Sequence, residues 1–117
     1  MPRYMFLLFD DETRWANATE DQISAAMALH NDFSAAVQAD GATVLGGEAL
    51  QASHTATVVR PRRDADAQVT DGPFAELKEA LGGYYVLECS DLDQALRLAA
   101  QCPSAAIEVR PVWEVGG

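Results

Sequence analysis

The stretch that most constrains the fold is residues 71–79, an Asp-Gly-Pro-Phe turn with a charged segment behind it and Gly82–Gly83 soon after. Such a turn cannot lie inside a helix or a central strand, because Gly72 permits unusual backbone angles and Pro73 fixes φ and removes a donor. We expect Phe74 to anchor the turn in the core, beside the first helix. The sequence therefore predicts a rigid loop between two β segments near the middle of the chain.

The bulk composition indicates one globular domain over residues 1–117, because 117 residues with 49% apolar content suffice for a single core. The net charge of −10 disfavours nucleic-acid and anionic-membrane partners. No apolar stretch is long enough to span a membrane, and the apolar run near the N-terminus is too short for a secretory signal. We therefore expect a cytoplasmic protein.

The cysteine pattern gives no sign of a metal site or a disulfide framework. Cys89 and Cys102 stand alone, and no Cys/His spacing typical of a metal site occurs. We expect both as buried free thiols. A phosphate-binding loop and a dinucleotide fingerprint are also absent from the sequence, so we expect no cofactor and no metal.

Hydrophobic periodicity and turn residues predict two helices among six short strands. Strands are expected at residues 4–9, 43–45, 55–60, 67–70, 83–89 and 106–113. One helix should run from about residue 20 to 40 and the other should begin after Ser90, each opening with a capping-box pattern. This order predicts an α+β protein, a split β-α-β arrangement with an inserted β-hairpin, which is the ferredoxin-like plan.

The faces of these elements carry a prediction about assembly. The first strand is apolar on both sides, with Tyr4, Phe6 and Leu8 alternating with Met5, Leu7 and Phe9. Two helices cover only one side of a sheet, and monomers avoid large exposed apolar patches. We therefore expect a homodimer that packs sheet to sheet. The expected buried helix positions are Ile23, Ala26, Met27, His30, Phe33 and Val37, then Leu92, Ala95, Leu96 and Ala99.

The run at residues 70–79, followed by residues 82–85, resembles the signature of DGPF-domain proteins in the YCII-related family. The resemblance extends through residues 46–50 and 107–112 and covers nearly the whole chain. It implies a ferredoxin-like fold paired into a dimeric α/β barrel, and it implies no defined activity. Leu77 departs from the family pattern, which usually has Thr there.

The wider family also places a His on the first helix in an acid–base pair with an Asp. His30 stands at the matching helix position, but Cys102-Pro103 stands where the resemblance would put an Asp-Pro. We expect Asp71, held in the stiff loop, to take that place. His30 and Asp71 are therefore the candidate catalytic pair, because an imidazole titrates near neutral pH.

Three further residues are candidate ligand contacts. Glu108 and Arg110 alternate with apolar residues on the last strand, so they should point away from the helices and into a cavity between paired sheets. Either they line that cavity, with Arg110 holding an anionic group, or they form an ordinary cross-strand ion pair. Trp15, on the loop after the first strand, either stacks on a ligand or covers the core.

Three functions remain open at this point. The first is a small homodimer that binds a small organic ligand in an inter-sheet cavity, with His30/Asp71 acid–base chemistry. The second is a non-catalytic regulatory or interaction protein, for example an accessory to a sigma factor, since members of the family are often encoded beside such factors. The third is a domain that serves only in dimerisation.

Overall fold

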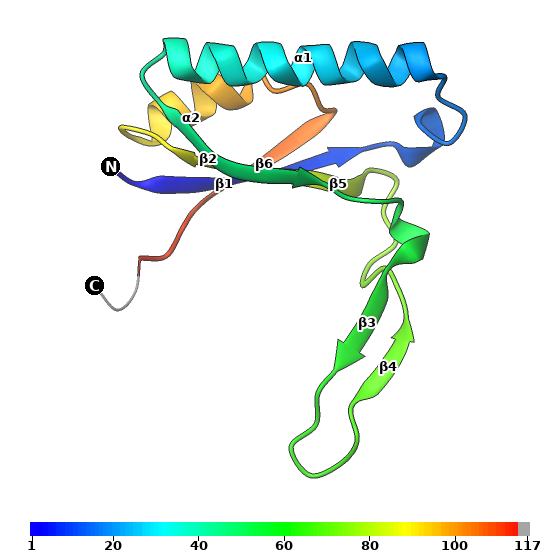
Figure 1. Cartoon of the computed structure of the whole chain (residues 1–117). Helices are drawn as coiled ribbons and strands as arrows, with labels where there is room; N and C mark the ends of the chain where they lie inside the picture. Colours follow the sequence, from blue (N-terminus) through cyan, green and yellow to red (C-terminus); the bar gives the residue numbers. More distant parts are fainter. Residues whose placement is uncertain (115–117) are drawn as a thin grey trace.

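The computed structural model describes residues 1–114 and has an α+β fold: two helices, a four-stranded antiparallel sheet and a separate two-stranded hairpin (Figure 1). The strands are β1 (Arg3–Asp10), β2 (Thr43–Ala49), β3 (Thr57–Arg60), β4 (Gln68–Asp71), β5 (Ala80–Glu88) and β6 (Ala106–Pro111). The helices are α1 (Glu20–Ala39) and α2 (Leu92–Ala99), with short 3-10 turns η1 (Glu12–Arg14) and η2 (Ser53–Thr55).

The main sheet has the strand order β2-β5-β1-β6, and every neighbouring pair is antiparallel. Strand β5 therefore lies between β1 and β2, the two strands that α1 connects. This is the split β-α-β connection predicted from the sequence. Both helices lie on one side of the sheet and leave the other side open (Figure 1).

The hydrophobic core lies between the helices and the covered side of the sheet. Tyr4, Phe6 and Leu8 share one face of β1, as predicted; that face is buried, and the residues between them are partly exposed. The core is completed by Phe33, Val37, Ala42, Leu87, Cys89, Ala95, Leu98 and Cys102. Both cysteines are free and buried, which confirms that expectation.

Helix α1 begins and ends where the sequence predicted. Thr19 and Gln22 form a reciprocal capping box, and Gly41 follows the helix with a φ of +82°. The predicted buried stripe is wrong in its N-terminal half, because Ile23 and Met27 are 49% and 60% exposed. The reason is a groove under that half of the helix, so only the C-terminal half packs on the sheet.

The buried face of α2 also differs from the prediction. Leu92 and Leu96 are exposed, whereas Leu98 and the polar Gln94 are buried. The Gln94 side chain is fully used there, since its amide nitrogen donates to the carbonyl of Asp40 at 2.7 Å and its oxygen accepts from Ser90 N at 2.7 Å. Because these hydrogen bonds replace those to water, burying the Gln94 amide costs little.

The β3–β4 hairpin projects away from the body of the protein (Figure 1). The radius of gyration is 16.5 Å, compared with about 13 Å for a compact domain of this length. The Asp-Gly-Pro-Phe turn that follows β4 lies against the segment before β3, where Gly72 N donates to the carbonyl of Ala56 at 2.8 Å, and not beside α1. The prediction that Phe74 is buried is wrong: it is 79% exposed, under the Arg60 guanidinium at 5.3 Å from the ring centre.

Within residues 1–114, neither helix combines the length and the apolar character needed to cross a bilayer.

The contrast between two phenylalanines gives a stability prediction. Phe33 is 2% exposed and packs between Phe6 and Tyr85, so Phe33→Ala should cost about 3–5 kcal/mol of unfolding free energy. Phe74→Ala should cost less than about 1 kcal/mol, as surface changes do. Urea unfolding of both variants measures this. Equal losses would contradict the placement of Phe74 on the surface.

Candidate functional site

His30 lies in the middle of α1, half-buried on the side that faces the sheet. Its Nδ1 is 2.7 Å from the hydroxyl of Tyr85 on β5, a hydrogen bond whose direction depends on the imidazole tautomer. Burial lowers the pKa of His30 from its ordinary value, and the nearby charge of Asp10 opposes that shift. At neutral pH the imidazole is therefore uncharged, with one ring nitrogen held by Tyr85.

The Tyr85 side chain can extend from β5 to His30 on α1 because the neighbouring strand β2 has a glycine opposite Tyr85. Gly47 pairs with Tyr85, and a Cβ built on Gly47 would lie 2.7 Å from the Tyr85 ring and 2.6 Å from the carbonyl oxygen of Tyr84. Tyr85 also packs on Phe33, with ring centres 5.2 Å apart. Burial raises the pKa of Tyr85, so its hydroxyl stays protonated.

Asp10 is the carboxylate whose charge acts on the pKa of His30, and the two residues line the same hollows. It ends β1, and its Oδ1 accepts from Ala105 N at 2.9 Å. Its charge acts on His30 and also on Cys102, whose pKa rises to about 12, mainly through burial. The Cys102 thiol therefore stays protonated and is a poor nucleophile.

A groove of about 880 Å³ lies under the N-terminal half of α1, and we call it the His30 groove. Its walls include Trp15, Ile23, Met27, His30, Leu50, Pro103 and the carboxylates Asp10 and Glu12. A smaller hollow of about 410 Å³ shares His30 and Asp10 and continues towards Tyr85. The volume suits a small organic molecule, since ligand pockets typically measure about 300–1,000 Å³.

The loop wall of the groove is held by hydrogen bonds. Both oxygens of Glu12 accept from Ser53, one from its backbone N and one from its hydroxyl, each at 2.6 Å. Asp11 caps η1 by accepting from Thr13 N at 3.0 Å, and Trp15 N donates to the carbonyl of Glu12 at 3.0 Å. These bonds fix the loop that carries Trp15 against η2, so the groove has a defined shape.

The structure brings only part of the predicted site together. His30 and Trp15 line the same groove. Asp71 lies at the base of the projecting hairpin, exposed and paired with Thr57, and lines neither hollow that His30 lines. In one chain the expected His30–Asp71 pair is therefore not formed, because β4 carries Asp71 out on the hairpin.

Glu108 and Arg110 also lie away from His30. They point to the open side of the sheet, where Arg110 Nε is 2.6 Å from Glu108 Oε2. The pair is within one strand, at positions i and i+2, and is not the cross-strand pair considered from the sequence. The side chains of Arg110 and Glu108 are 73% and 43% exposed to solvent, so the ion pair should contribute little to stability.

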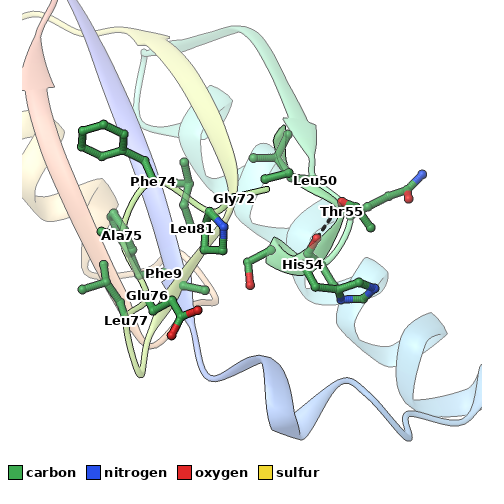
Figure 2. A pocket seen from close by; sticks show the side chains of 16 residues that line it. Phe9, Leu50, His54, Thr55, Gly72, Phe74, Ala75, Glu76, Leu77 and Leu81 are labelled. Carbon is green, nitrogen blue, oxygen red and sulfur yellow. Dashed lines mark hydrogen bonds between the residues drawn. The ribbon is translucent and has the colours of Figure 1, made fainter. Parts of the chain in front are cut away.

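A second cavity, of about 700 Å³, lies beside the residues 72–77 loop (Figure 2). Figure 2 shows its ionisable side chains turned in different directions, with the His54 ring directed away from Glu76 and from the loop. Phe74 likewise points away from the cavity. Because no polar groups converge there, we regard the His30 groove as the better candidate site.

Three residues around His30 were not among the predicted site residues: Asp10 and Glu12, which line the groove, and Tyr85, which lines the smaller hollow. One signal was available for Tyr85, because paired glycines in a strand often mark close approach of another group. Gly46–Gly47 is such a pair, and Gly47 does lie against Tyr85.

These features define a class: a small α+β protein with a histidine-centred groove between its long helix and one end of its sheet. The YCII-related domain family matches residues 3–116. An uncharacterized protein of Rhizobium meliloti (strain 1021) is 31% identical over 118 residues, which cover 93% of this chain and 90% of that protein. The chain therefore belongs to the YCII-related domain family.

The two glycines of β2 offer a matched test of how Tyr85 is positioned. Gly47→Ala should force the Tyr85 ring away and cost about 1–3 kcal/mol, as overpacking does. Gly46→Ala should change stability by less than about 0.5 kcal/mol, because nothing lies within 4 Å of a Cβ built there. Urea unfolding measures the stability of each. Similar losses at both positions would show that close packing on Tyr85 is not the reason for Gly47.

The charge of Asp10 gives a prediction for the titration of His30. Asp10→Asn keeps the oxygen that accepts from Ala105 N but removes the charge that raises the pKa of His30. The pKa of His30 should therefore fall further, as measured by NMR titration of the imidazole. Asp32→Asn, on the exposed side of α1, is the control and should leave it unchanged. An unchanged value in Asp10→Asn would place Asp10 outside the site.

Proposed function

We propose that this YCII-related protein binds a small organic molecule in the His30 groove and that His30 transfers a proton to or from it. The observation that carries the proposal is the half-buried imidazole on the wall of a largely apolar groove. One ring nitrogen is held by Tyr85, and Nε2 has no hydrogen-bond partner among residues 1–114. A polar group so placed is available to a ligand.

The electrostatics support His30 as a general base. Because burial lowers its pKa, the imidazole is already neutral at pH 7 and can accept a proton. In one tautomer Nδ1–H donates to the Tyr85 oxygen, and Nε2 carries a lone pair that can accept a proton. In the other tautomer Nδ1 accepts from the Tyr85 hydroxyl, and Nε2–H is a donor. Asp10 would stabilise the imidazolium that forms. We therefore assign the role expected of Asp71 to Asp10.

The proposal places the ligand between helix and sheet within one chain, and not between two sheets. It retains the homodimer, with the ferredoxin-like halves paired into a dimeric α/β barrel. The open side of the sheet supports this, because Met5 lies opposite Val86 and Leu7 opposite Tyr84 in an apolar strip that the helices do not cover. Burying that strip against a second copy would remove it from water.

A non-catalytic interaction protein is the second candidate, favoured by the hairpin. Val59 and Val69 face each other across it and are more than half exposed. A two-stranded hairpin is marginally stable alone in water, so an arm with uncovered apolar pairs suits contact with another chain. This function and ligand binding in the groove use different parts of the molecule.

Ligand binding is tested by a thermal-shift screen of small aromatic and aliphatic compounds. Compounds that bind the native protein should raise its Tm, by mass action. His30→Gln should lose at least half of that shift, whereas Asp32→Asn, on the exposed side of the same helix, should keep it. If a compound raised the Tm of His30→Gln and of Asp32→Asn by the same amount, it would bind outside the groove. The proposal that the groove is the ligand site would then be wrong.

The dimer is tested by light scattering at micromolar concentration. Wild type should give twice the chain mass of 12.6 kDa. Leu7→Asp, in the middle of the open strip, should give the monomer mass, because a charge buried between two sheets is strongly disfavoured. Ala35→Glu, on the exposed side of α1, should remain dimeric. A wild-type monomer would overturn the pairing of sheets.

A further inference from the structure

The His30 groove is lined by two carboxylates and by the imidazoles of His30 and His54, but by no Lys or Arg. Asp10 and Glu12 both contribute to its walls. The chain has eight Lys and Arg residues, all within the part that the structure describes, and none of them lines the groove. The smaller hollow behind it adds Glu48 and again no Lys or Arg.

Arg14, on η1 between the lining residues Thr13 and Trp15, is not among the residues that line the groove, and two other cations are paired with carboxylates away from it. Arg110, expected from the sequence to hold an anionic group, is bound to Glu108 on the open side of the sheet. Arg97 is paired with Asp40 near the other end of α1. A carboxylate or phosphate that entered the groove would therefore lose its hydration without gaining a cationic partner, which is costly.

Hydrogen bonds hold both carboxylates in position. Hydrogen bonds from the hydroxyl and the backbone N of Ser53 lower the pKa of Glu12, so it is ionised at neutral pH. Asp10 Oδ1 is held by Ala105 N, and Oδ2 has no hydrogen-bond partner among residues 1–114. One acceptor oxygen is thus free beside the neutral imidazole of His30.

We infer that the ligand class of the His30 groove is an organic cation, a protonated amine on a flat apolar body, and not a carboxylate or phosphate. The inference rests on the proposed function, since it assumes that the groove is the binding site. Acidic walls around a concave apolar surface concentrate positive charge. Trp15 adds a second reason, because the indole ring is the best aromatic partner for a cation and lies in the same groove.

The test uses three probes with one apolar body and different charges: 2-naphthylmethylamine, 2-naphthalenemethanol and 2-naphthoate. Affinities are measured by isothermal titration calorimetry at pH 7.5 and low salt. The amine should bind about tenfold or more tighter than the alcohol, and the carboxylate weakest, given the size of a Coulomb interaction near a protein surface. Raising the salt to about 0.5 M should reduce the preference for the amine.

Two charge-neutralising variants assign the preference to the groove. Asp10→Asn keeps an oxygen that accepts from Ala105 N, and Glu12→Gln keeps an oxygen that accepts from Ser53. In each variant the ratio of amine affinity to alcohol affinity should fall several-fold. Asp32→Asn, outside the groove, should keep the ratio. Circular dichroism checks that each variant is folded, and if Glu12→Gln unfolds the loop, Asp10→Asn alone decides.

The outcomes separate this inference from the proposed function. If 2-naphthoate binds as tightly as the amine and His30→Gln weakens both, the groove is a ligand site and the inference about charge is overturned. If none of the three probes binds, or His30→Gln changes nothing, the groove is not the site and both statements fall.

Discussion

The contact of Tyr85 with Phe33 on one side and His30 on the other joins the hydrophobic core to the candidate site. The ring centres of Phe6 and Phe33 are 6.4 Å apart, those of Phe33 and Tyr85 5.2 Å, and those of Tyr85 and His30 5.9 Å. In this series of rings Phe6 and Phe33 are buried, and His30 is half-exposed. The position of the imidazole is therefore set by packing that the protein needs for stability anyway, which is how a scaffold holds a functional group still.

Local features of the fold were predictable from the sequence because their causes are local. The capping box at Thr19 and the N-cap hydrogen bond of Asp91 each join residues three apart, and the turn residues that bound the strands act on their own backbone. The strand β2 was predicted to end at residue 45, before Gly46 and Gly47, but it runs to Ala49. Both glycines lie within the strand, and Gly47 is the one that leaves room for Tyr85.

Features that depend on distant partners were not predictable in the same way. Gln94 looks like a surface residue until Asp40, 54 positions away, supplies its acceptor. Phe74 looks like a core anchor until the hairpin is seen to project from the body. The same limit applied to the site: His30 stood out as the one titratable group on an apolar stripe, but its partner Tyr85 is 55 positions away and Glu12 is fixed by Ser53, 41 positions away.

The groove itself follows from the length of α1. A helix of 20 residues is about 30 Å long. The buried side chains of α1 are Phe33 and Val37, and both lie in its C-terminal half. The first half keeps large apolar side chains, Ile23 and Met27, over a hollow where they gain little from burial. A helix selected only for stability would carry polar residues there, as exposed faces do. Apolar side chains kept over an open groove, beside a neutral imidazole and two fixed carboxylates, resemble the lining of small-molecule sites, which is mostly apolar with a few placed polar groups.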